Sequence, residues 1–249
     1  MTAPRRVLGA DGCRSGWVTV SLVDGTVRTV EVVTELAEAL AGPVYDAVAV
    51  DMPIGLVDGP RDADRAARSL LPGRASSVFS APPRTVTDEV RRGSVTTHAV
   101  ATARADEVAG AGISMQTWRL LPAIIEVDAL VAAGHDLHEV HPELAYALLA
   151  GDAVPRKRSW AGITTRRALL ERHGVTLPDR FPGDELAAPD DVVDAAVCAW
   201  VADAIAGAGD VLRVPEPPTQ HDRDRPIVIT ARVPPAPTPG PRRRARASR

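Results

Sequence analysis

The first fifty residues contain four segments with the pattern of β-strands, and this feature constrains the fold most. Segment 6–10 is apolar, whereas 17–23 and 27–33 alternate around Asp24-Gly25, a pair typical of a hairpin turn. A short helix is predicted over 35–40 with Thr34 as its N-cap, and the fourth strand follows over 45–51. This order predicts an α/β fold in which helices cover a sheet.

The remaining elements are mostly helical. Helices are predicted near 61–71 and 95–110, and the clearest one covers 116–134, where Leu120, Ile124 and Val127 recur at helical spacing. A brief fifth strand over 138–141 leads into helices over 143–150, 162–173 and 190–205. The resulting order matches that of the ribonuclease H fold: a mixed sheet flanked by helices, with a helical insertion after strand four.

Composition narrows the class of protein. The 249 residues are 45% hydrophobic and 24% charged, as in soluble globular proteins, and no apolar run is long enough to span a membrane. The N-terminus lacks the apolar stretch and cleavage site of a signal peptide. Two cysteines, Cys13 and Cys198, cannot form a disulfide framework or a four-cysteine zinc site. We therefore expect a cytoplasmic protein.

The C-terminal residues differ from the rest in composition. From Pro215 onward there are nine prolines and eight arginines against three acids, a charge of +5, which leaves −8 on residues 1–214 given the total of −3. Such a segment is expected to be a disordered, basic tail, so we predict a domain over 1–214 and a tail over 215–249. The arginines could form an arm that binds nucleic acid, or the tail could be merely solvated.

Aspartates lie at strand ends and on the last predicted helix. Asp11 follows the first strand and Asp51 ends the fourth, whereas Asp191 and Asp194 are three residues apart and so share a helix face. Each alone could be a turn residue or a helix cap. Together they would repel one another strongly without a cation, and an all-oxygen set suits Mg²⁺ or Mn²⁺. Two such ions can activate a water and stabilise the leaving oxygen of a phosphodiester.

Six motifs occur in an order that resembles one known family. They are Gly9-Ala-Asp-Gly-Cys-Arg-Ser-Gly-Trp17, Asp51-Met-Pro-Ile-Gly-Leu56, Gly73-Arg-Ala-Ser-Ser-Val-Phe79 with Pro82-Pro-Arg84, Ile124-Ile-Glu-Val-Asp128, Glu139-Val-His-Pro-Glu143 and Asp190-Asp-Val-Val-Asp-Ala195. The chain resembles, over residues 7–205, a family of unknown function usually described as predicted ribonuclease-H-like nucleases. That description is itself inferred from fold and acids.

The resemblance implies roles for individual residues. Asp11, Asp51, Asp191 and Asp194 would be metal ligands, and Glu143 would be a further catalytic acid, either a ligand or a base that orients water. Substrate contacts are expected from residues of the family-like motifs and from a basic segment, namely Arg74, Ser76, Ser77, Gln116 and Lys157. Gln116 could instead be a helix N-cap.

Other polar residues leave alternatives open. Arg61, Arg65, Arg68 and Arg84 could bind phosphates together with Arg74, or could form an exposed helix face and a loop. Glu126 could reach the site or be a solvated helix residue. A zinc site made of His135, His138 and His141 is not favoured, because their spacing does not keep them on one face of a strand and no cysteine lies near.

The sequence thus predicts a metal-dependent phosphodiester hydrolase, most simply a nuclease, acting on nucleic acid or a small phosphodiester. The acidic body argues against long duplexes as substrates. An alternative is a non-catalytic module of the same fold that binds metal or nucleic acid. A phosphotransferase is less favoured, because related kinases and ATPases need two such domains and because no Walker-type loop is present.

Overall fold

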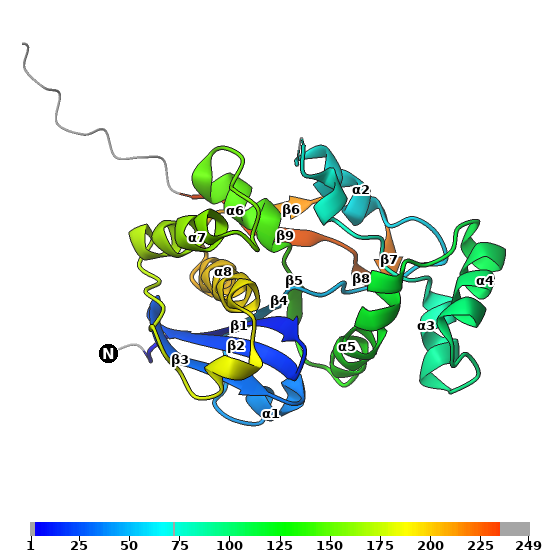
Figure 1. Ribbon diagram of the computed structural model, residues 1–249, viewed down its shortest axis with the longest axis horizontal. Helices are drawn as coiled ribbons and strands as arrows, with labels where there is room; N and C mark the ends of the chain where they lie inside the picture. The colour runs from blue at the N-terminus through cyan, green and yellow to red at the C-terminus, as the bar shows by residue number, and fades with distance from the viewer. Residues whose placement is uncertain (1–2, 72, 235–249) are drawn as a thin grey trace, which may run out of the picture.

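A five-stranded mixed sheet forms the centre of the protein. The computed structural model describes residues 3–71 and 73–234. The strands are β1 (Arg6–Cys13), β2 (Gly16–Val23), β3 (Thr26–Val33), β4 (Ala47–Val50) and β5 (Leu137–Glu139), in the order β3-β2-β1-β4-β5 (Figure 1). β1 runs antiparallel to β2 and parallel to β4, which is parallel to β5. The predicted α/β class is confirmed.

Helices bury both faces of this sheet. Successive side chains of β1 point to opposite faces and therefore pack against different helices. Val7 packs on one face with α6 (Pro142–Ala150), α7 (Trp160–Arg172) and α8 (Pro189–Ala206). Leu8 packs on the other face with α1 (Leu36–Leu40) and α5 (Met115–Ala132). Among the helices of the described ranges, none has both the length and the apolar character that crossing a membrane would require.

The insertion between β4 and β5 contains α2 (Asp62–Ser69), a 3-10 turn η1 (Ala75–Ser77), α3 (Arg84–Arg91), α4 (His98–Ala109) and α5. The sequence analysis missed α3, a short and largely polar helix. Its Val86 is buried in a small separate core with Ala101 and Leu121. Helix α1 also differs from the prediction: Glu35 rather than Thr34 is the N-cap, and the Glu35 N–H donates to Glu38 Oε1 at 3.1 Å.

The prediction that the chain lacks structure from Pro215 onward is wrong for residues 215–234. Strand β6 (Val211–Val214) pairs antiparallel with β9 (Ile229–Arg232), and β7 (His221–Asp222) with β8 (Arg225–Pro226) forms a short hairpin between them. Ile227 and Ile229 are buried against α2 and α6, which explains why this segment folds despite its prolines. The arginine-rich end, 235–249, lies outside the described residues.

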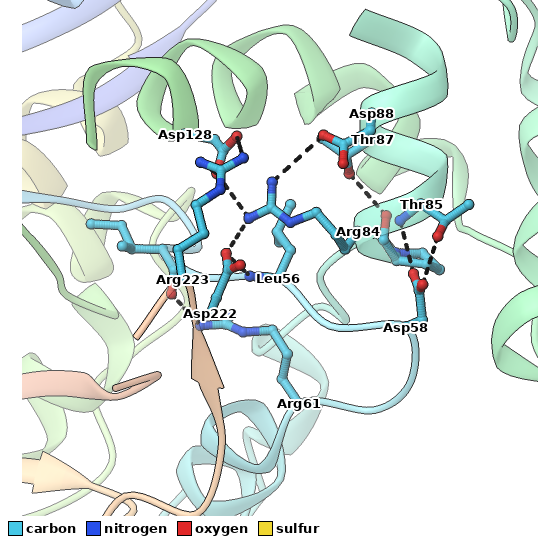
Figure 2. A network of polar contacts seen from close by, with 12 residues as sticks. Leu56, Asp58, Arg61, Arg84, Thr85, Thr87, Asp88, Asp128, Asp222 and Arg223 are labelled. Carbon is cyan, nitrogen blue, oxygen red and sulfur yellow. Dashed lines mark hydrogen bonds and ion pairs between the residues drawn. The ribbon is translucent and has the colours of Figure 1, made fainter. Parts of the chain in front are cut away.

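A polar network joins this C-terminal segment to the insertion (Figure 2). Asp222 of β7 accepts hydrogen bonds from the Leu56 N–H at 3.0 Å and from the Arg84 guanidinium. The same arginine donates to Asp128 of α5 at 2.9 Å, and Asp128 also pairs with Arg223 at 3.4 Å. The hairpin β7–β8 therefore holds the turn after β4, α3 and α5 together.

Replacing Ile229 by Ala tests this C-terminal structure. Because Ile229 is 1% exposed, the truncation should lower the free energy of unfolding by about 2–5 kcal/mol. Val233→Ala, at a position that is 42% exposed, is the control and should change it by less than about 0.5 kcal/mol. Urea-induced unfolding followed by circular dichroism measures both, and equal stabilities of the two variants would contradict the packing of β9.

Candidate active site

A cavity of about 670 Å³ opens where β1 and β4 end, beside the first turns of α8. Because β1 and β4 are parallel, their carboxyl ends lie at the same edge of the sheet. The cavity wall includes every residue that the sequence analysis proposed for the site: Asp11, Asp51, Arg74, Ser76, Ser77, Gln116, Glu143, Lys157, Asp191 and Asp194. These residues come from seven separate segments of the chain.

Three of the aspartates form a tight cluster. Asp11 lies on β1, Asp51 directly follows β4 and Asp194 lies on α8, and one carboxylate oxygen of each is within 4.8 Å of the others. Asp11 is 6% exposed and Asp194 only 1% exposed, so the cluster forms the floor of the cavity. Within the described residues, the groups able to hold a metal are these aspartates, and no histidine belongs to them.

Burial raises the pKa values of all three carboxyls, and repulsion by neighbouring acids adds to this effect. Burial, followed by the charges of Asp51 and Asp194, raises the pKa of Asp11 well above its usual value. Burial raises the pKa of Asp51 to about 6, although Lys157 partly offsets this effect. The pKa of Asp194 rises to about 7, again through burial and against the opposing effect of Lys157. The cluster therefore needs positive charge to be fully ionised at neutral pH.

Lys157, the only lysine in the sequence, supplies part of that charge. Its Nζ lies 2.5 Å from Asp194 Oδ2. Burial opposes its ionisation, but the charges of Asp194, Asp51 and Asp11 outweigh this and raise the pKa of Lys157. Asp194 Oδ1 is buried and has no hydrogen-bond partner in the described part of the chain. One carboxylate oxygen of the cluster thus remains unpaired beside two other acids, which is the chemistry that a divalent cation would satisfy.

The other two predicted acids, Glu143 and Asp191, line the cavity outside the cluster. Glu143 pairs with the buried Arg166 and lies 3.6 Å from Arg74. Asp191 Oδ2 accepts a hydrogen bond at 3.3 Å from the Ala188 N–H and so caps α8. Neither acid belongs to the cluster of three. Their roles as an additional catalytic acid and a metal ligand stay predictions.

Apart from Lys157, the polar residues predicted to contact substrate come from the insertion. Ser77 Oγ donates to the Arg74 carbonyl at 2.8 Å and so stabilises the η1 turn. Ser76 and Gln116 are exposed on the cavity wall. Gln116 is not an N-cap, because Ser114 caps α5 by accepting a hydrogen bond from the Thr117 N–H at 3.0 Å.

Several residues left open by the sequence lie outside this cavity. Glu126 accepts a hydrogen bond from Trp17 Nε1 at 2.8 Å, on the far face of the sheet. The arginines Arg61, Arg65, Arg68 and Arg84 do not line it. Arg61 is instead buried in ion pairs with Asp64 at 2.9 Å and Glu139 at 2.5 Å. Of the five arginines considered together, Arg74 alone lines the cavity.

Sequence reasoning missed the contribution of Glu139. This buried residue at the end of β5 accepts a hydrogen bond from the Ile54 N–H at 2.7 Å, and Arg61 donates to the Ile54 carbonyl at 3.2 Å. The pair thus holds both backbone groups of Ile54, three residues after Asp51. The sequence held a signal for this residue, because Glu139 begins the family-like motif that ends in Glu143. Arg158, which belongs to the basic segment around Lys157, lies 3.3 Å from Asp190 and also lines the cavity.

Substituting Asp51 by Asn tests the electrostatic cost of the cluster in metal-free buffer. The pKa of Asp51 is higher in the folded than in the unfolded protein, so the wild type loses stability as pH rises from about 4 through about 6. The free energy of unfolding of Asp51→Asn should equal that of the wild type near pH 4 and exceed it at pH 8 by on the order of 2 kcal/mol. Asp179→Asn, at a side chain 96% exposed, is the control for chemical unfolding at both pH values. A less stable Asp51→Asn at pH 8 would contradict the raised pKa.

Comparison with known proteins places the chain in a family. No curated protein and no solved structure matches it. Residues 9–220 match a family model described as "Protein of unknown function (DUF429)", and this match extends past β6 into the C-terminal segment. The family resemblance seen in the sequence motifs is confirmed, and the chain belongs to the DUF429 family.

Proposed function

We propose that this protein is a metal-dependent phosphodiester hydrolase that holds Mg²⁺ or Mn²⁺ on Asp11, Asp51 and Asp194. The observation that carries the proposal is the cluster of three carboxylates within 4.8 Å on the floor of a cavity. The strand order, with acids at the ends of β1 and β4 and on α8, supports a ribonuclease-H-like fold. The basic residues of the cavity wall support an anionic substrate.

The cluster fits such an ion by its chemistry. All three groups are carboxylates, the ligands of hard cations such as Mg²⁺ and Mn²⁺, and Asp194 Oδ1 is buried without a partner among the described residues. When bound, such an ion supplies Lewis acidity, which polarises a phosphoryl oxygen and lowers the pKa of water.

The remaining residues would bind and orient the phosphodiester. Lys157 offsets the negative charge of the cluster, so that an anionic phosphate can approach the buried aspartates. Arg74 and the exposed hydroxyl of Ser76 would contact phosphate oxygens from the cavity wall. Glu143, held in place by Arg166 on the cavity wall, would accept a proton from the attacking water.

A binding module of the same fold that holds an ion without catalysis is the alternative. Such a module would hold the ion on the same aspartates but would leave a bound phosphodiester uncleaved. Each position of the cluster carries an ionisable aspartate rather than an asparagine, and the cavity above it has room for a substrate, both of which favour hydrolysis.

Mn²⁺ titration by calorimetry tests the site, with Asp194→Asn as the variant and Asp179→Asn as the control. Changes outside the ligand shell usually weaken metal binding 10–100-fold, so loss of a ligand should weaken it by at least about 100-fold. The control should bind as the wild type does. Absence of Mn²⁺ binding to the wild type at millimolar concentration would refute the metal site.

Cleavage is then measured with the same proteins on bis(4-nitrophenyl) phosphate, single-stranded DNA, RNA and branched duplexes. The wild type should hydrolyse at least one of these only with Mg²⁺ or Mn²⁺, and Asp194→Asn should lose at least about 100-fold in rate. Metal binding without hydrolysis of any of them would favour the non-catalytic module.

A further inference from the structure

Trp160, the first residue of α7, has an unusual environment for a tryptophan. It is 84% exposed, whereas Trp17 and Trp200 are each 1% exposed and Trp118 is half-buried. Exposure alone does not assign it a role, because single apolar side chains are common on protein surfaces. Its position in the chain is informative, because Trp160 follows Arg158, a residue that lines the candidate active site, by two residues.

The residues just before Trp160 form a basic rim of that cavity. Arg156, Lys157 and Arg158 are consecutive, and all three line the cavity. The Arg158 side chain is 86% exposed. The rim is packed tightly on the start of α7: a Cβ at Gly162 would lie 1.9 Å from the Arg156 carbonyl oxygen. The backbone thus fixes the exposed Trp160 at the start of α7, two residues after Arg158 of the rim.

The depth of the aspartate cluster restricts what can reach it. Asp11 and Asp194 are 6% and 1% exposed, so a phosphate must descend to the cavity floor to meet them. The cavity volume of about 670 Å³ is in the usual range for small-ligand pockets, about 300–1,000 Å³, and so accepts only a few nucleotides. A phosphate in a stacked, paired duplex cannot leave its helix in this way, whereas a single strand can bend.

The insertion side of the cavity offers surfaces suited to unpaired bases. Gln116 and Leu120 are four residues apart on α5, on one face of the helix, and both line the cavity with Phe79. An aromatic ring and an aliphatic side chain can pack on the face of a base, and an exposed amide can hydrogen-bond to its edge.

We infer that the substrate of this site is a single-stranded nucleic acid whose unpaired bases stack on Trp160 at the rim while its phosphates contact Arg156 and Arg158. The inference rests on the proposed function, because it assigns the substrate class of the same site. Cationic side chains beside exposed aromatic rings are the combination with which proteins bind single strands. The net charge of −8 on residues 1–214 agrees with it, because that charge repels the many phosphates of a long duplex.

The test uses the fluorescence of tryptophan in the full-length protein. An oligothymidylate dodecamer is titrated in millimolar Ca²⁺, a cation that oxygen ligands also bind. Stacking on Trp160 should quench the emission of the wild type, since Trp17 and Trp200 are buried. Trp160→Phe should bind the strand with little loss of affinity but without that quenching, when binding is followed by anisotropy of a labelled strand.

Trp160→Ala should bind the strand more weakly by about 5- to 150-fold, the range measured for loss of one base–aromatic stack. Val44→Ala is the matched control, because Val44 is an exposed apolar side chain (89%) that does not line the cavity. An abasic strand and a hairpin duplex of equal phosphate number should both bind more weakly than the dodecamer. An RNA strand of the same sequence shows which sugar is preferred.

Three results would overturn the inference: no saturable binding of either strand, equal affinity of Trp160→Ala and wild type, or tighter binding of the duplex. Its failure is separable from that of the proposed function. Quenching without metal-dependent cleavage of any substrate would leave the single-strand site and remove the hydrolase. Cleavage of bis(4-nitrophenyl) phosphate with strand binding unchanged in Trp160→Ala would support the hydrolase and remove the single-strand site.

Discussion

The close contact of α8 with β1 at Gly9 determines the geometry of the candidate site. A Cβ at Gly9 would lie 2.1 Å from the Ala199 nitrogen and 2.2 Å from the Ala195 carbonyl oxygen, so only glycine lets the helix backbone rest on the strand. Asp11 lies two residues beyond Gly9 and therefore points to the same face of the sheet. Asp194 directly precedes Ala195. Any larger residue at position 9 would push α8 away and move Asp194 from Asp11.

This closeness has an electrostatic cost that the rest of the fold must offset. Burial raises the pKa values of Asp11, Asp51 and Asp194, so bringing the three together in ionised form opposes folding. Helix α8 is secured against that repulsion by its apolar residues, among them Trp200, which is buried over the sheet. Lys157 compensates part of the charge from a loop, and a divalent cation would compensate more.

Local pattern was enough to predict most of the sheet and the convergence of the acids. An apolar run predicted β1, alternation and the Asp24-Gly25 turn predicted β2 and β3, and aspartates at the ends of parallel strands necessarily meet at one edge. Helix α3 was missed because its short, polar sequence has a weak helical pattern and gains its stability from tertiary contacts of Val86. Strands β6 and β9 were missed because their pairing joins residues about fifteen or more apart, through prolines, where sequence pattern carries little information.

The distinction between Asp191 and Asp194 also required coordinates. Both lie on one helix face by spacing, but the Asp191 carboxylate turns back to the Ala188 N–H, whereas Asp194 faces β1 and β4. Helix-capping competes with ligation for an acid in a first turn, and spacing alone cannot show which prevails. Glu139 shows the converse case: a motif acid that stabilises the turn after Asp51 from within the core.

The C-terminal segment belongs to the same structural unit as the cavity. One wall of the cavity comes from η1 and α5 in the insertion, and the aspartates come from the sheet and α8. Asp222 bonds to Leu56, five residues after Asp51, and through Arg84 to Asp128 of α5 (Figure 2). The separation between the insertion wall and the acidic floor is thus fixed partly by a residue beyond position 214, and the family match ends two residues before it. A chain ending at 214 would keep its acids but lose the support that positions the opposite wall.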